Sequence, residues 1–235
     1  ELAITGYPPE DLLFNPQFIR DNLERMRQIV CASKDIGVVV GFANKDPDFQ
    51  STNVPKAEIY NAAAVALNGR MAGIYHKIHL PNYGVFDEVR YFGTSTECPV
   101  YVVNGIHMGV NICEDIWYND GPTVIQRAAG AEVIVNINGS PYHTGKRNER
   151  ERMLVRRATE NGVFLAYVNL VGGQDELVFD GCSVAFDEEG QCIGQAAPFR
   201  EDILFVNFND KKRININYKS RNENVFDALC LGIKD

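Results

Sequence analysis

The sequence predicts a mixed α/β fold in which helices cover layered β-sheets. Short apolar runs that suit buried strands alternate with segments of helical periodicity, and hairpins interrupt this alternation. The chain has 235 residues, of which 45% are hydrophobic and 10% aromatic, so it is long enough to bury one sizeable core. These observations argue against a helical bundle and predict one layered domain over most of the chain.

In the first half of the chain, polar residues that turn or end the backbone separate the apolar segments. Asn15-Pro16 precedes apolar residues at helical spacing, and Asn68-Gly69 is a strong hairpin signal. Residues 82–92 have no clear period, so they are expected to form a loop that lines a binding site or packs on the surface. The expected elements are a turn at Gly6 to Pro9, a helix from Asn15-Pro16 to near Gly37, a strand at Val38 to Phe42, a polar loop from Asn44 to Lys56, and strands at Ile59 to Leu67 and Met71 to Ile78.

The second half repeats an order of strand, polar end and helix. Residues 1–208 are expected to form one domain, residues 209–224 a polar and basic linker, and residues 225–235 the first helix of a further domain. The expected elements are a β-rich segment from Val100 to Ile112 with a turn at Asn104-Gly105, a helix opening after Cys113, a helix at Pro122 to Gly130, a strand at Ala131 to Ser140, a charged helix at Asn148 to Asn161, a strand at Val163 to Val171 broken by Gly172-Gly173, a hairpin of Leu177 to Phe186 with Gln191 to Ala196, and a strand at Ile203 to Phe208.

Charge and cysteine content argue against several classes of function. The formal net charge of −8 is unsuited to a nucleic-acid surface or an anionic membrane, and no apolar run approaches the ~18 residues of a membrane span. Six cysteines with no Cys-x-x-Cys pair, and four histidines in no spaced motif with them, indicate neither a metal site nor a disulfide framework. A cytoplasmic protein with reduced thiols, acting on small molecules or protein, fits best.

The stretch Gly109 to Trp117 places a cysteine where an apolar strand stops and acidic residues suited to a helix start begin. Such a corner would hold the sulfur of Cys113 on a rigid elbow beside backbone N–H groups. A thiol there becomes a nucleophile when a neighbouring cation or base helps to form the thiolate. The alternative is one more buried structural cysteine, as expected for the five others: Cys31, Cys98, Cys182, Cys192 and Cys230.

Three short motifs in order along the chain resemble the Glu, Lys, Cys triad of the nitrilase or carbon-nitrogen hydrolase superfamily. Glu1 lies in Glu-Leu-Ala-x-Thr-Gly-Tyr, Lys77 in His-Lys-x-His-Leu-Pro, and Cys113 in x-Ile-Cys-Glu-Asp-x-Trp. Three further stretches are similar to the glutaminase domains of glutamine-dependent NAD synthetases, namely Leu80 to Phe92, Asn138 to Tyr142 and Gly172 to Leu177. The resemblance runs from Glu1 to about Phe208 and implies a four-layer α-β-β-α sandwich of nitrilase type.

The resemblance also implies a role for each catalytic group. Cys113 would attack the carboxamide carbon of glutamine, and Glu1 would accept the thiol proton and later activate water. Lys77, with the backbone N–H of Glu114, would stabilise the oxyanion, and Glu88 would be the second glutamate beside the triad. The alternatives are a disordered first residue for Glu1 and a solvent-exposed strand-end lysine for Lys77.

Five residues match positions of the glutamine pocket in these glutaminases. A charged amino acid substrate requires polar groups for its ammonium and carboxylate. The alternative is that these residues serve ordinary packing or lie on the surface. The five are Tyr7, Tyr83, Phe86, Ser140 and Lys146.

Further expectations follow from the resemblance. The glutaminase step needs no cofactor, whereas ATP and Mg²⁺ belong to a separate synthetase domain that would receive the ammonia and amidate deamido-NAD. L-glutamine is the expected substrate and a homo-oligomer the expected assembly. The family has a strand and a helix before its catalytic glutamate, so a chain that begins at Glu1 without methionine is expected to be a fragment. The alternatives are a stand-alone amidase or carbamoylase, and a non-catalytic interaction domain of the same fold.

Overall fold

The structure is a computed structural model that describes residues 1–45, 59–210, 212–214, 216 and 218–235. The polar loop expected from Asn44 to Lys56 falls almost entirely outside these ranges. None of the described helices is long and apolar enough to cross a bilayer.

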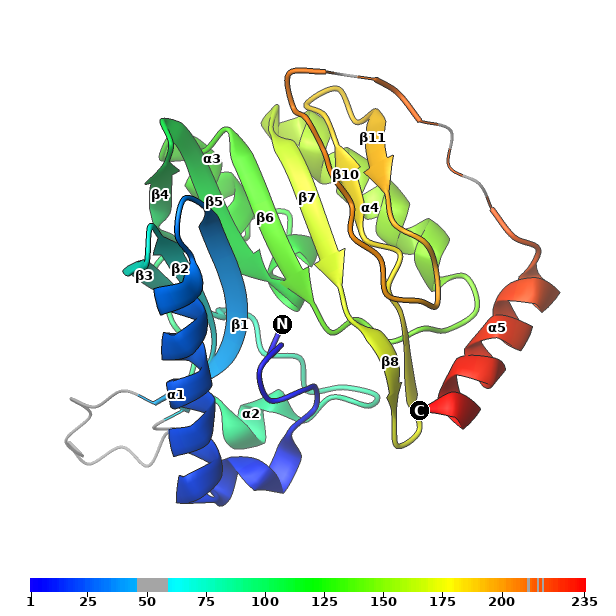
Figure 1. Cartoon of the computed structure of the whole chain (residues 1–235). Helices are drawn as coiled ribbons and strands as arrows, with labels where there is room; N and C mark the ends of the chain where they lie inside the picture. The colour runs from blue at the N-terminus through cyan, green and yellow to red at the C-terminus, as the bar shows by residue number, and fades with distance from the viewer. Residues whose placement is uncertain (46–58, 211, 215, 217) are drawn as a thin grey trace.

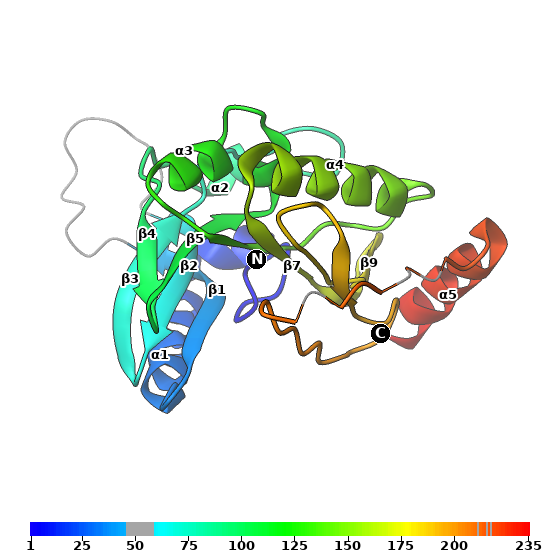
Figure 2. The same cartoon turned by 90° about the horizontal axis from the view of Figure 1, so that it is seen from above.

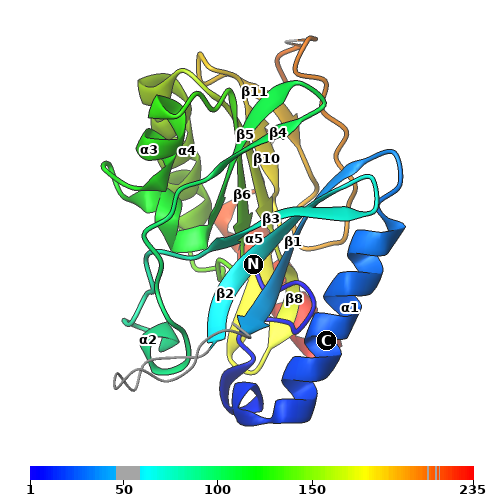
Figure 3. The same cartoon turned by 90° about the vertical axis from the view of Figure 1, so that its left-hand side faces the viewer.

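Two β-sheets form the centre of the fold, and helices cover their outer faces (Figure 1). Views from above and from the side show α1 outside the smaller sheet and α3 with α4 outside the larger one (Figures 2 and 3). The layers are therefore α-β-β-α, as the resemblance implied. The helices are α1 (Pro16–Ala32), α2 (Glu88–Tyr91), α3 (Pro122–Ala128), α4 (Lys146–Asn161) and α5 (Arg221–Lys234), with 3₁₀ turns η1 (Glu10–Phe14) and η2 (Cys113–Trp117).

The smaller sheet is antiparallel with the order β1-β2-β3, and the larger sheet is mixed with the order β11-β10-β7-β6-β5-β4. A separate two-stranded ribbon joins β8 to β9. The strands are β1 (Gly37–Lys45), β2 (Ile59–Leu67), β3 (Arg70–His76), β4 (Val100–Val103), β5 (Ile106–Ile112), β6 (Val133–Asn138), β7 (Phe164–Asn169), β8 (Val171–Gln174), β9 (Leu177–Asp180), β10 (Val184–Phe186) and β11 (Cys192–Gln195).

The first helix begins and packs as its sequence dictates. The Asn15 side chain accepts hydrogen bonds from the backbone nitrogens of Gln17 and Phe18, and Pro16 occupies the first helical position. The apolar face of α1, with Met26 and Val30, packs on a row of alanines along β2. These methyl groups let the helix lie close to the sheet. The row consists of Ala62, Ala64 and Ala66.

The opposite face of β2 forms the core between the two sheets. Ala63 and Val65 pack there with Tyr75 of β3 against Val110 and Ile112 of β5. Successive residues of a strand point to opposite faces, so this one strand contributes to both the helix–sheet and the sheet–sheet core. Cys113 belongs to the sheet–sheet cluster, which places it between the layers.

Three parallel strands determine where the functional loops meet. β5, β6 and β7 run parallel, with α3 and α4 as the connections between them. The carboxyl ends of parallel strands lie at one edge of a sheet, so the residues that follow them come together. Cys113 follows β5 and Gly139 follows β6 at this edge.

The last expected strand is wrong. Residues 203–208, all of which the structure describes, form no strand. Ile203 and Phe205 expose 78% and 89% of their surface, whereas Leu204 and Val206 are half-buried and lie close to Gly194 of β11. The segment therefore packs alternate side chains against the sheet, but its backbone forms no hydrogen-bonded ladder with the edge strand β11, and a strand requires such a ladder.

The expected strand from Leu177 to Phe186 is in fact two strands. Gly181 and Cys182 both adopt positive φ (62° and 52°), which breaks the extended backbone between β9 and β10. β9 therefore pairs with β8, which includes Gly172-Gly173, whereas β10 pairs with β7 and β11. Gly172-Gly173 consequently lies within a strand and does not interrupt one.

Several helical segments also differ from expectation. The segment after Cys113 is a 3₁₀ turn, and the loop at 82–92 contains the single turn α2. α4 begins at Lys146, two residues before the expected start. α5 begins at Arg221 because Ser220 and Glu223 form a reciprocal capping box inside the expected linker. α5 lies against the β8–β9 ribbon (Figure 1).

Candidate active site

Cys113 stands at the elbow that the sequence predicted, directly after β5. Its backbone has φ +43°, in the left-handed region that residues other than glycine rarely adopt. The residue is 5% exposed and opens η2. A backbone strained in this way persists only where its surroundings hold it, and such residues concentrate at functional sites.

Lys77 follows β3 and is completely buried. Its ammonium donates to Glu1 Oε1 at 2.5 Å and to Glu88 Oε1 at 2.8 Å. Tyr7 also donates its hydroxyl to Glu88 Oε1, at 2.7 Å. One buried cation is therefore shared by two buried carboxylates, and the surface lysine that we considered as the alternative is excluded.

Glu1 is held in place from three directions. Asn61 Nδ2 donates to its Oε1 at 2.7 Å, opposite Lys77, and the Gly139 N–H donates to Oε2 at 2.9 Å. A Cβ atom on Gly41 would lie 2.5 Å from the backbone nitrogen of Leu2, so only glycine lets β1 pass this close. Glu1 is thus an ordered, buried residue in this structure.

The electrostatics of the cluster keep the resting thiol neutral. Burial raises the pKa of Cys113 well above its usual value, and the Glu1 carboxylate adds to this rise against the opposing effect of Lys77. Burial lowers the pKa of Lys77, but its two carboxylate partners outweigh this effect and raise the pKa well above the usual value. A base must therefore take the thiol proton before the sulfur can attack.

The two carboxylates differ in protonation because their surroundings differ. Burial raises the pKa of Glu1, but Lys77, the α-ammonium group of the same residue and the Gly139 N–H together outweigh it, so that the pKa falls to about 2. Burial, with the negative charge of Glu1 nearby, raises the pKa of Glu88 to about 8. Glu88 Oε2 is buried and has no hydrogen-bond partner among the described residues, which fits a protonated oxygen. At neutral pH Glu1 is the carboxylate that can accept a proton.

The raised pKa of Glu88 predicts a pH dependence of stability. Between about pH 4.5 and pH 8 the folded state holds a proton on Glu88 that the unfolded chain has lost, so the contribution of Glu88 to the free energy of unfolding falls as pH rises through this window. We expect Glu88→Gln to flatten this decline. The midpoint of urea unfolding, measured at several pH values across the window for both proteins, checks it.

The control for this experiment is Glu151→Gln, which removes another buried glutamate, one bound by Arg147 and Tyr218. This variant should keep the wild-type slope. An equal slope in wild type and Glu88→Gln would mean that Glu88 is ionised in the folded protein at neutral pH.

Four of the five residues matched to the glutamine pocket contact one another or the η2 turn that begins at Cys113. Tyr7 and Tyr83 both contact Phe86, with ring centroids 6.4 Å and 5.6 Å away, and the Tyr83 hydroxyl donates to the Glu114 carboxylate. Lys146 opens α4 and places its ammonium 4.2 Å from the centre of the Trp117 ring. Their role in binding stays a prediction.

Ser140 is buried in the turn after β6. Its backbone N–H donates to Asn169 Oδ1 at 2.9 Å, and its carbonyl accepts from Asn169 Nδ2 at 3.2 Å. These bonds fix the turn that also presents the Gly139 N–H to Glu1. The Glu114 backbone N–H directly follows the nucleophile in sequence, and its role at the oxyanion stays a prediction.

Three groups at this site escaped the sequence analysis. Asn61 is the single amide in an otherwise apolar and aromatic strand, and this exception could have indicated a functional role. The Gly139 N–H is a backbone donor, and a backbone group cannot be identified from the residue type. Asp115 was assigned only to a helix start, yet its side chain is buried and accepts four hydrogen bonds.

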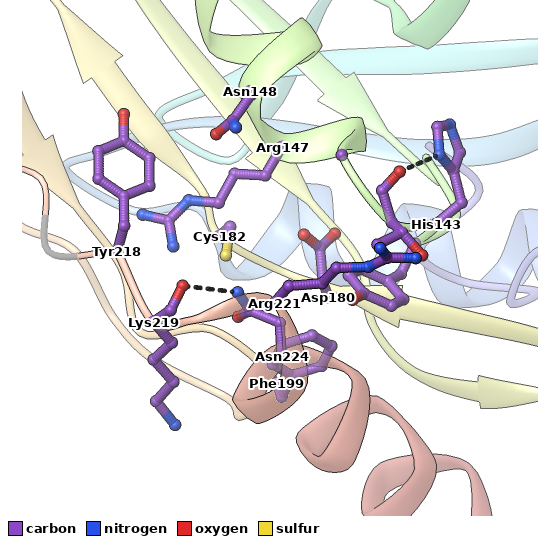
Figure 4. Close-up of a pocket in the computed structure, with 13 residues that line it drawn as sticks. His143, Arg147, Asn148, Asp180, Cys182, Phe199, Tyr218, Lys219, Arg221 and Asn224 are labelled. Atoms are coloured by element: carbon purple, nitrogen blue, oxygen red, sulfur yellow. Dashed lines mark hydrogen bonds between the residues drawn. The ribbon is translucent and has the colours of Figure 1, made fainter.

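Two cavities among the described residues differ in their relation to this cluster. One, of about 240 Å³, is lined by Tyr7, Phe86 and Glu88 and so reaches the catalytic cluster. A larger one, of about 640 Å³, lies between the start of α4, the end of β9 and the segment that enters α5 (Figure 4). Arg147, Lys219 and Arg221 line it, and it touches none of the four clustered residues. The described residues contain no group of three or more His, Cys, Asp or Glu side chains arranged to bind a metal.

The family model for carbon-nitrogen hydrolases matches residues 1–214. The chain belongs to the carbon-nitrogen hydrolase family. Among curated proteins it is 46% identical over 206 residues to the glutamine-dependent NAD(+) synthetase of Aquifex aeolicus, covering 88% of this chain and 35% of that protein. The corresponding enzyme of Thermotoga maritima is 41% identical over 219 residues, covering 92% and 36%. The chain thus spans little more than a third of the length of these relatives.

Solved structures of family members share the fold. The glutamine-dependent NAD+ synthetase of Acinetobacter baumannii superposes with a TM-score of 0.87 at 34% identity, over 98% of this chain and 43% of that one. An amidase from Nesterenkonia superposes with a TM-score of 0.71 at 24% identity, over 86% and 72%, which supports the fold alone. The four-layer nitrilase-type sandwich expected for this carbon-nitrogen hydrolase is confirmed.

Proposed function

We propose that this carbon-nitrogen hydrolase chain hydrolyses the side-chain amide of glutamine and supplies the ammonia to an NAD synthetase. The observation that supports this proposal most is the buried cluster in which Lys77 joins Glu1 and Glu88 beside the strained Cys113. The names of the relatives, which are glutamine-dependent NAD(+) synthetases, add the substrate and the product.

The chemistry proceeds through a thioester. Glu1 takes the thiol proton while Cys113 Sγ attacks the carboxamide carbon, and Lys77 with the Glu114 N–H stabilises the oxyanion of the tetrahedral intermediate. The C–N bond then breaks, and the proton on Glu1 passes to the departing nitrogen, which leaves as ammonia. Glu1 next deprotonates a water molecule that attacks the thioester, releasing glutamate and restoring the thiol.

The same proposal assigns binding and partners. Tyr7, Tyr83, Phe86, Ser140 and Lys146 hold glutamine, and no cofactor takes part in this hydrolysis. The partner is a synthetase domain like that of the longer relatives, where ATP and Mg²⁺ serve the amidation of deamido-NAD. The assembly is a homo-oligomer in the cytoplasm, which suits the six free cysteines.

Ammonia release from a panel of amides tests the proposal. We expect kcat/KM for glutamine to exceed that for acetamide and for an N-carbamoyl amino acid by about a hundredfold or more, since buried polar groups left without partners penalise substrates that lack the charged end. A glutamine-like diazoketone should label Cys113. Preference for acetamide or the carbamoyl compound would instead identify a stand-alone hydrolase. Absence of turnover together with an unlabelled Cys113 would identify an interaction domain.

A further inference from the structure

We propose that Asp115 is a positioning residue that fixes the Cys113 elbow against the segment carrying Lys77, and so sets the thiol opposite the ammonium. The inference rests on the hydrolysis proposed above, for which both groups are required. Asp115 is completely buried, on the η2 turn two residues after the nucleophile.

The Asp115 carboxylate accepts four hydrogen bonds from two parts of the chain. On the nucleophile side, the Ile112 N–H donates to Oδ2 at 3.1 Å. On the lysine side, the N–H groups of Ile78 and His79 donate to Oδ1 at 3.2 Å and 2.8 Å, and the Tyr75 hydroxyl donates to Oδ2 at 2.7 Å. One side chain therefore bridges the smaller sheet to the larger one.

The bonded residues adjoin the two reactive groups in the chain. Ile112 directly precedes Cys113, and Ile78 directly follows Lys77. A shift of either segment would lengthen hydrogen bonds at the same carboxylate, so the separation of thiol and ammonium is coupled to Asp115. The bond to Ile112 also closes the turn that holds Cys113 at φ +43°.

Packing alone does not account for a carboxylate at this position. Burying a charged group is unfavourable unless hydrogen bonds compensate it, and an apolar side chain would fill the same space without that cost. Burial does raise the pKa of Asp115, against the opposing effects of the His79 N–H and the Lys77 charge. The carboxylate fixes the orientation of both chain segments, because each of its oxygens accepts from a different pair of donors.

The test is Asp115→Asn, with two measurements. An amide nitrogen in place of one oxygen faces N–H donors and cannot accept from them. We expect kcat for glutamine to fall at least about tenfold, with KM within about threefold, if the change acts on the reacting groups and not on binding. We also expect iodoacetamide to alkylate Cys113 more slowly at a fixed pH, measured on the Cys113 peptide by mass spectrometry.

The alkylation rate separates positioning from a simple charge effect. Glu1, Glu88 and Lys77 are the charged groups that act most strongly on Cys113, with weaker effects at Tyr7, Tyr83 and Lys146. If Asp115 acted only through its charge, its removal would leave fewer anions near the thiol, and alkylation would be equal or faster. An equal or faster rate in a folded Asp115→Asn protein overturns the proposal.

Asp187→Asn is the matched control. Asp187 is 2% exposed, and its carboxylate accepts from the backbone nitrogens of Glu189 and Gln191 at 3.0 Å and 2.7 Å, in the turn between β10 and β11. This variant loses a buried, hydrogen-bonded charge far along the chain from Cys113. It should retain wild-type kcat and wild-type alkylation, and losing both as Asp115→Asn does would overturn the proposal.

Tyr75→Phe keeps the test decisive if Asp115→Asn fails to fold. It removes a single donor to the carboxylate, and we expect kcat and the alkylation rate both to fall a few-fold; unchanged rates overturn the proposal.

Alkylation needs no amide substrate, so it tests the positioning role separately from the hydrolysis. If the protein releases no ammonia but its variants are alkylated more slowly, the positioning role is supported and the hydrolysis is rejected.

Discussion

Cys113→Ala should reduce ammonia release from glutamine by at least about a thousandfold, since loss of a catalytic nucleophile removes the covalent route altogether. The fold should survive, because the change removes one sulfur atom at a 5% exposed site and alanine tolerates the elbow no worse than cysteine. Single-turnover assays with glutamine, together with circular dichroism, check both expectations. A covalent glutamyl adduct should be absent from the variant.

Cys182→Ala is the matched control for this prediction. Cys182 is also buried, at 4% exposure, and it also has a left-handed backbone with φ +52°. Its replacement therefore repeats the structural change without touching the clustered carboxylates and ammonium. Should both variants lose the same fraction of activity, the loss would stem from structure and Cys113 would not be the nucleophile.

Lys77→Met should cost both activity and stability. Removing the ammonium leaves the Glu1 carboxylate buried without a cation and takes a hydrogen-bond donor from protonated Glu88, and breaking a buried ion pair in this way lowers the free energy of unfolding by about 3–5 kcal/mol. Glutamine hydrolysis should fall by at least about a hundredfold, because the oxyanion loses its cationic partner. Urea unfolding and steady-state ammonia release measure the two effects.

The double variant Lys77→Met with Glu1→Gln separates them. A neutral amide at position 1 replaces the carboxylate that Lys77→Met leaves ionised and without a cation, so part of the lost stability should return while activity does not. If Lys77→Met unfolds at the same urea concentration as the wild type, the carboxylates do not depend on the ammonium and the described ion pairs contribute little.

Local signals in the sequence predicted the elements that local chemistry determines. Asn68-Gly69 and Asn104-Gly105 each adopt positive φ at both residues, as tight hairpins require, and α1 begins where Asn15-Pro16 indicated. Residues 203–208 were predicted as a strand from composition. Whether a strand forms there depends on whether its backbone pairs with a neighbouring strand, which the sequence of the segment alone does not determine.

The residues of the candidate site likewise differ in whether a local sequence pattern could reveal them. Cys113 was recognisable because an apolar strand ends there and acidic residues follow. The roles of Lys77, Glu1 and Glu88 were inferred from the resemblance to carbon-nitrogen hydrolases, since no local sequence pattern indicated them. The donors that hold Glu1 were missed because they lie far from it in sequence: Asn61 is 60 residues away and Gly139 is 138 residues away. Such contacts exist only after the two sheets have packed.

The sharing of one ammonium by two carboxylates has a consequence for the overall charge of the centre. With Lys77 positive, Glu1 negative, Glu88 protonated and Cys113 a neutral thiol, these four groups sum to zero at neutral pH. An uncharged carboxamide therefore meets four groups that carry no net charge together, and every proton transfer proposed above stays among these groups and the substrate. The nearby Asp115 carboxylate is compensated by its own four hydrogen bonds, so the buried site holds no charge whose lost solvation is left without compensation.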